Sequence, residues 1–146
     1  MKMQSVATRR LLLVDTGTLV ALIDAGDPAH QAMGETMKRL PRRQLLTTWP
    51  CLTEAMYLLG TVAGYRFQAP LWNYLSSGLL EAHDLTLSEQ ARMQVLMAKY
   101  ADTPMDLADA SLVVVAESLG LQQVLTLDDD FYLYRLADGT VLEVLR

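Results

Sequence analysis

The sequence has one cysteine, no long uninterrupted hydrophobic run and no excess of positive charge, and each of these shortages excludes something. The single cysteine, Cys51, excludes an internal disulfide framework and is typical of a reducing compartment. Its apolar neighbours, with no base nearby, favour a buried structural thiol over a nucleophile. Twelve Lys and Arg face seventeen Asp and Glu, a net charge of −5. This balance argues against a protein that binds nucleic acid through phosphate contacts alone.

The absence of a long hydrophobic run bears on membrane insertion. Residues 11–23 are mostly apolar and follow a basic N-terminus, which is the order found in secretory signals. However, Asp15 interrupts the run, and no small-x-small cleavage pattern follows it closely. The run is also too short to cross a bilayer. We therefore expect a cytoplasmic protein with no membrane segment.

What the chain does have is length and apolar content enough for one well-packed domain. We expect a single domain over residues 1–146, with residues 1–10 as a short N-terminal extension. Hydrophobic residues make up 51% of the chain, which is rich for a domain of this size. The excess indicates that a partner covers part of the apolar surface.

Predicted strands alternate with predicted helices along the chain. Short apolar runs predict strands at 11–14, 45–48, 79–85, 124–127 and 140–145. Helical periodicity and end signals predict helices at 16–25, 28–40, 49–60, 64–75, 89–100, 106–119 and 128–134. Asp27 and Ser88 are the expected caps of two of them, and Pro70 is expected to break another. The alternation favours an α/β fold whose mainly parallel sheet has helices on both faces and binds ligands at the carboxyl ends of its strands.

Four carboxylates stand alone in apolar segments. Asp15 and Asp128 each end a predicted strand, Glu54 is the only charged residue of its predicted helix, and Asp109 lies on the inward-facing stripe of another. Burying a lone carboxylate costs several kcal/mol or raises its pKa, and no Lys or Arg occupies a comparable inward position. One divalent metal site, of Mg²⁺ or Mn²⁺, would compensate all four, because these ions prefer oxygen ligands and also bind phosphates.

Each acid also has an ordinary interpretation. Asp15 could cap the helix that follows it, and Glu54 could be an exposed helix residue. Asp106 is expected to be a helix cap, and whether it or Asp130 joins the site stays open. Residues expected to lie in a solvated turn, on the surface or in packing are Asp129, Asp130, His30 and His83. The metal-site hypothesis therefore depends on the four acids as a set.

These segments together resemble a PIN domain, in particular the VapC-like ribonuclease toxins of bacterial toxin–antitoxin pairs. The resemblance covers residues 11–145, and the motifs that carry it, in order, are LLVDTGTLVALID, LTEA, PMDLADASL and LTLDDDF. It implies a three-layer α/β/α sandwich around a mainly parallel sheet. It also implies a Mg²⁺- or Mn²⁺-dependent endoribonuclease that hydrolyses RNA phosphodiester bonds.

The resemblance assigns roles to individual residues. The positions that match the family's four metal-site acids, and so its catalytic residues, are Asp15, Glu54, Asp109 and Asp128. Asp15 and Asp109 would be the most direct ligands, whereas the other two would hold a second ion, orient water or act indirectly. Thr16 and Thr126 match supporting hydroxyl residues next to the first and last acids.

The resemblance further implies an RNA substrate, a cognate antitoxin and a homodimer. An apolar groove for an antitoxin helix could come from Tyr57, Leu58, Leu59, Tyr65, Phe67, Leu71, Trp72 and Tyr74, although these side chains could instead fill the core. Basic candidates for RNA contact, which could equally be solvated surface, are Arg9, Arg10, Lys38, Arg39, Arg42 and Arg43.

Two other functions fit parts of the sequence. Residues 15–19, DTGTL, echo the phosphoaspartate motif of haloacid-dehalogenase-like phosphatases, but Gly17 stands where those enzymes carry a second Asp, and the chain is short for that fold. A non-catalytic PIN-like binding module is the second alternative, against which the complete acidic set argues. The RNA target, the antitoxin, the number of ions and the choice of Mg²⁺ or Mn²⁺ stay open.

Overall fold

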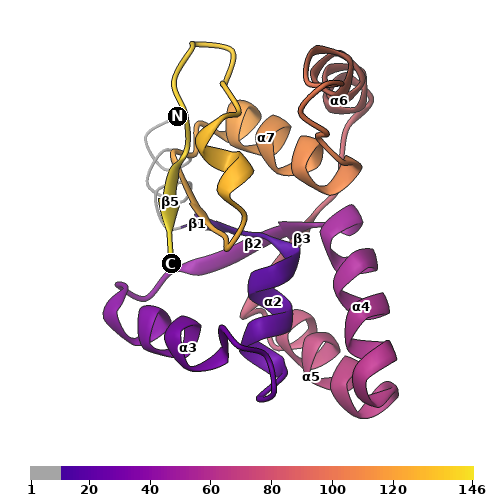
Figure 1. The fold of residues 1–146 in the computed structure, drawn as a ribbon, viewed down its shortest axis with the longest axis vertical. Coiled ribbons are helices and arrows are strands. Elements are labelled where there is room, and N and C mark those ends of the chain that lie inside the picture. Colours follow the sequence, from indigo (N-terminus) through magenta and orange to yellow (C-terminus); the bar gives the residue numbers. More distant parts are fainter. Residues whose placement is uncertain (1–10) are drawn as a thin grey trace.

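A five-stranded parallel sheet forms the middle layer of the computed structural model, which describes residues 11–146 (Figure 1). The predicted extension 1–10, with Arg9 and Arg10, lies outside the described residues. The strand order is β3-β2-β1-β4-β5, and every neighbouring pair is parallel. The strands are β1 (Leu11–Val14), β2 (Gln44–Thr48), β3 (Leu80–His83), β4 (Gln123–Leu125) and β5 (Glu143–Leu145).

Helices cover both faces of this sheet, so the predicted α/β/α sandwich with a parallel sheet is confirmed. In Figure 1, α6 (Leu87–Lys99) and α7 (Leu107–Leu119) lie above the sheet, and the other α-helices lie below it. The lower helices are α2 (Thr16–Ile23), α3 (His30–Arg39), α4 (Trp49–Ala63) and α5 (Tyr65–Ser76). A short 3₁₀ helix, η1 (Asp129–Tyr132), follows β4.

The period-two alternation of β1 divides the core between the two faces. Leu12 and Val14 belong to the cluster under α2, α4 and α5, whereas Leu13 belongs to the cluster under α6 and α7. Such a strand is buried on both sides, which explains why it is a continuous apolar run in the sequence. The run ends at the carboxyl edge of the sheet, where Asp15 follows.

Helix α7 is enclosed on nearly every side, rather than along one stripe as predicted. Residues 108–116 are all buried, Asp109 and Ser111 among them. Asp106 caps the N-terminus by accepting a hydrogen bond from the Asp109 amide at 2.8 Å, and Gly120 ends the helix in the left-handed conformation with φ +66°. The helix is thereby fixed at both ends with its first turn directed at the sheet edge.

Several predicted element ends are wrong, and side-chain hydrogen bonds account for two of them. Thr86, not Ser88, caps α6, because Thr86 and Glu89 form a reciprocal capping box. Asp27 accepts from the Ala29 amide at 2.8 Å in a turn, so α3 begins two residues later than predicted. Pro70 lies inside an unbroken α5, anchored on one face by the buried Leu71.

Within residues 11–146, no helix is both long enough and apolar enough to span a bilayer.

Candidate metal centre

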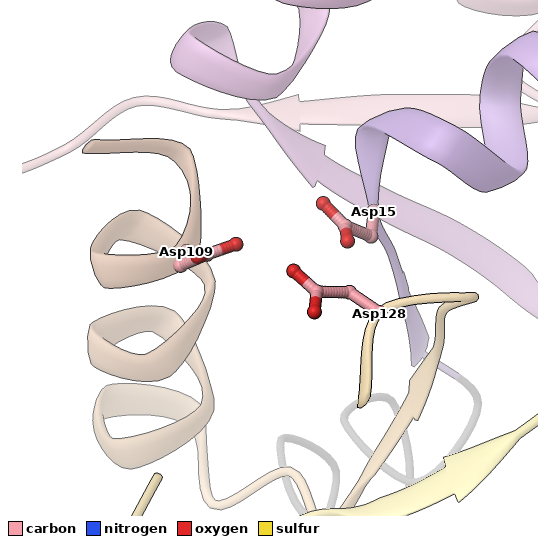
Figure 2. A group of neighbouring side chains, drawn as sticks. All are labelled: Asp15, Asp109 and Asp128. Atoms are coloured by element: carbon pink, nitrogen blue, oxygen red, sulfur yellow. The ribbon is translucent and has the colours of Figure 1, made fainter. Parts of the chain in front are cut away.

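Three carboxylates meet at the carboxyl edge of the sheet. Asp15 follows β1 and caps α2, Asp128 caps η1 after β4, and Asp109 lies in the first turn of α7. Figure 2 shows all three side chains directed at a common point from these separate elements. One oxygen from each lies within 4.8 Å of the other two. This is close enough for a single ion to bind all three.

Two threonines fix the first of these carboxylates. Asp15 accepts from the Thr16 amide on Oδ1 at 2.7 Å and from the Thr126 hydroxyl on Oδ2 at 2.9 Å. The same Thr126 oxygen accepts from the Asp128 amide at 3.0 Å. Asp15 is therefore both the predicted helix cap and a member of the cluster, and one hydroxyl ties it to the segment that carries Asp128.

The Asp109 carboxylate is held by Tyr134, a residue that the sequence analysis did not identify. The Tyr134 hydroxyl donates to Asp109 Oδ2 at 3.0 Å, and both residues are buried. The two positions are separated by 25 residues, and no spacing or motif in a single sequence connects them. A buried tyrosine needs a hydrogen-bond partner for its hydroxyl, but which partner follows only from the fold.

No positive charge compensates these acids in the described part of the chain. Its ion pairs are His83–Glu89, Arg92–Glu117 and Arg146–Asp129, and none of them includes a clustered acid. Burial raises the pKa of Asp15 to about 6, with hydrogen bonds from Thr126 and Thr16 acting against it and the charges of Asp128 and Asp106 adding to it. Burial, followed by the charges of Asp106 and Asp15, also raises the pKa of Asp109. Buried, mutually repelling carboxylates of this kind are suited to a divalent cation.

Glu54 differs from the other three acids. It is exposed on α4, so its inferred burial is wrong, and it does not belong to the close cluster. It is linked to the cluster through Thr16, whose hydroxyl donates to Glu54 Oε2 at 3.3 Å and also lies 3.3 Å from the Cys51 carbonyl. Glu54 therefore lies at the exposed edge of the site, and Thr16, which bonds to both acids, connects it to Asp15.

Asp106 and Asp130 lie near the cluster but are not among the three carboxylates whose oxygens lie within 4.8 Å of one another. Asp106 caps α7 as predicted, yet its charge contributes to the raised pKa values of Asp15 and Asp109, so it lies near them. The Asp130 amide donates to Asp128 Oδ1 at 2.9 Å, and the Asp130 side chain is half-buried rather than fully solvated.

The cysteine and the histidines have the structural roles that the sequence predicted. Cys51 is buried, and burial raises the pKa of its thiol to about 12. His30 Nδ1 lies 2.6 Å from the Ala21 carbonyl, and His83 pairs with Glu89 at 2.9 Å. None of the three belongs to the acidic cluster.

The basic candidates within residues 11–146 lie far from the acids. Lys38 and Arg39 end α3, and Arg42 and Arg43 precede β2, so all four lie at the amino edge of the sheet. Arg39 donates to Thr36, and Arg43 donates to Gln123. In a parallel sheet, this edge is opposite the one that carries the carboxylates.

Comparison with known proteins gives relatives with this fold, although no family model matches the chain. The ribonuclease VapC26 of Mycobacterium tuberculosis is 27% identical over 117 residues, which cover 80% of this chain and 86% of that protein. The structure of M. tuberculosis VapC20, a sarcin–ricin loop cleaving toxin, has a TM-score of 0.79 at 21% identity and covers 92% of this chain and 99% of its own. VapBC2 of Rickettsia felis, solved with a DNA fragment from its promoter, has a TM-score of 0.64 at 15% identity, covering 93% and 99%.

The parallel sheet and the acids at its carboxyl edge define the class as a PIN-like α/β domain, and the structural matches support this fold over almost the full chain. In sequence the chain is similar to a VapC ribonuclease, which agrees with the resemblance that its motifs indicated. The phosphatase alternative is not retained, because Gly17 offers no second carboxylate and the similar proteins found by comparison are VapC proteins.

Proposed function

We propose that this chain is a metal-dependent endoribonuclease and the toxin of a toxin–antitoxin pair. The observation that carries the proposal is the set of three carboxylates within 4.8 Å of one another, two of them buried, with no cationic partner in residues 11–146. The name of the mycobacterial relative, a ribonuclease, supports RNA as the substrate.

Each site residue has a defined part in this proposal. Asp15, Asp109 and Asp128 hold Mg²⁺ or Mn²⁺ through oxygen ligands. The ion supplies positive charge that offsets the phosphate and lowers the pKa of attacking water. Thr126 keeps Asp15 in place and Thr16 connects it to Glu54. We assign Glu54 to orienting the attacking water, because it is the most exposed of the four, whereas Asp128 is half-buried and the other two are buried.

The first prediction concerns the carboxylate of Asp15. Asp15→Asn keeps the side-chain size but removes one of the charges that hold the ion, so RNA cleavage should fall by at least about 100-fold. The measurement is cleavage of a defined RNA by purified protein with Mn²⁺ or Mg²⁺, and a chelator should abolish it.

Asp102→Asn is the matched control, because Asp102 is exposed in the loop between α6 and α7. This variant should cut RNA at the wild-type rate. If Asp15→Asn cleaves as fast as Asp102→Asn in preparations free of other nucleases, the proposed mechanism is wrong.

We also propose an antitoxin and a homodimer as protein partners, in a cytoplasmic setting. The apolar side chains of α4 and α5 were expected either to form a groove for an antitoxin or to fill the core. Leu59 and Leu71 fill the core. Tyr57, Tyr65 and Trp72 are exposed. The exposed aromatic residues support a covered surface on these helices. A small adjacent gene for a DNA-binding antitoxin and the mass of the purified protein in solution test the two partners separately.

A further inference from the structure

Tyr134 stands out among the residues that the proposed mechanism does not use. It follows η1, its side chain is buried, and its hydroxyl donates to Asp109 Oδ2 at 3.0 Å. Asp109 is one of the three clustered carboxylates, so this hydroxyl contacts the candidate site directly. Like Thr126, it reaches its carboxylate from a distant part of the chain.

The ring of Tyr134 is held by two other aromatic rings. Phe131 packs edge-to-face against it with centroids 5.3 Å apart, and Tyr100 does so at 5.2 Å. The Tyr100 hydroxyl accepts from the Arg135 amide at 2.8 Å, which fixes the backbone next to Tyr134. Because ring and backbone are both held, the hydroxyl has little freedom to leave Asp109.

The segment 128–134, which contains Tyr134, also carries Asp128, one of the three clustered carboxylates. Asp128 lies six positions before Tyr134, and the fully buried Phe131 anchors the stretch between them. Asp128 and Asp109 bear like charges at close range, which would push this segment away from α7. The bond from Tyr134 to Asp109 acts in the opposite direction and joins the two elements.

We propose that Tyr134 is a positioning residue that orients the Asp109 carboxylate toward the cation. The inference rests on the metal site of the proposed function. A carboxylate has about four lone-pair positions, and one bond from Tyr134 leaves the others for a cation while limiting rotation of the group. Partners that orient a ligand in this way typically change metal affinity by about 10- to 100-fold when they are removed.

The test compares two variants that each remove one tyrosine hydroxyl. Tyr134→Phe keeps the ring and its packing but loses the bond to Asp109, whereas Tyr132→Phe loses a hydroxyl from an exposed ring on η1. Mn²⁺ binding to each purified protein is measured by calorimetry without RNA. Tyr134→Phe should bind Mn²⁺ about tenfold more weakly, and Tyr132→Phe should stay within about twofold of the wild type.

A second measurement separates orientation from loss of folding. In RNA cleavage, Tyr134→Phe should need a higher Mn²⁺ concentration for half-maximal rate but approach the wild-type rate at saturating Mn²⁺. A misfolded variant would not recover in this way. Wild-type affinity in Tyr134→Phe, or an equal loss in both variants, overturns the inference.

The inference and the proposed function can fail separately. If the wild type binds Mn²⁺ and Tyr134→Phe weakens that binding, but no RNA is cut, the positioning role stands and the nuclease proposal fails. If RNA is cut and Tyr134→Phe binds Mn²⁺ normally, the reverse holds. A wild type that binds no Mn²⁺ contradicts both.

Discussion

At the residue scale, single hydroxyl groups determine how the carboxylates are arranged. Thr126 serves two acids at once, since it donates to Asp15 and accepts from the amide of Asp128. Tyr134 serves Asp109 from a different segment. The acids are thus held in place by neutral donors that orient them without cancelling their charge, which leaves the charge available for a cation.

The raised pKa values make the stability of the metal-free protein depend on pH. Asp15 has a pKa of about 6 when folded, against 3.8 for an unperturbed aspartate, so the folded state binds more protons between these values. Stability should therefore decrease as the pH rises from about 4 through 6, and the raised pKa of Asp109 extends the loss to higher pH. Because one pKa unit corresponds to about 1.4 kcal/mol, the total is on the order of a few kcal/mol.

Thermal unfolding in a chelator at pH 5 and pH 8 measures this loss. The wild type should melt at a lower temperature at pH 8, and added Mn²⁺ should restore stability there, because an ion that binds only the folded state stabilises it. Asp15→Asn should show a weaker pH dependence. An unchanged dependence in that variant would show that Asp15 is not responsible.

The acids were predictable from the sequence, whereas their supports mostly were not. Asp15 and Asp128 end apolar strands, and parallel topology brings the ends of neighbouring strands to one edge. The predicted burial of Glu54 was wrong, because a helix rich in apolar residues can still expose one face. The contact of Tyr134 with Asp109 depends on how the segment after η1 packs against α7, which no local pattern encodes.

At the element scale, the order and type of the strands and helices were predictable, but several of their ends were not. Apolar runs and periodicity carry the first kind of information. The ends depend on individual side-chain hydrogen bonds. At α6 the sequence contains the signal, since Thr86 and Glu89 have the spacing of a capping box, but Ser88, directly before the predicted helix 89–100, is a capping residue type as well.

This capping box gives a stability prediction. Thr86→Ala removes the hydroxyl that accepts from the Glu89 amide at 3.1 Å, so the free energy of unfolding should fall by about 1 kcal/mol. Ser88→Ala is the control, because Ser88 is exposed inside the first turn, and it should change the value by less than about 0.5 kcal/mol. Urea unfolding of both variants measures the difference. If Ser88→Ala is the more damaging change, the cap has been assigned to the wrong residue.

At the scale of the whole molecule, charge is separated between the two edges of the sheet. The clustered acids lie at the carboxyl edge, whereas residues 38–43, with four cations, lie at the amino edge. The five residues of β2 span roughly 16 Å at about 3.3 Å each, so the edges are far apart relative to a hydrogen bond. A scissile phosphate held at the acids therefore cannot contact these cations.

This separation predicts how charge reversal at the amino edge affects cleavage. Arg42 is exposed and forms no ion pair among residues 11–146, so Arg42→Glu removes only a distant attraction for RNA. Cleavage of a short oligonucleotide should stay within about twofold of the wild type, because the Debye length at physiological salt is about 8 Å and screens the change. A tenfold slower cleavage of the same oligonucleotide would place the RNA path across the amino edge instead. A protein with net charge −5 would then depend on its few basic residues to hold RNA, rather than on the ion at its carboxylates.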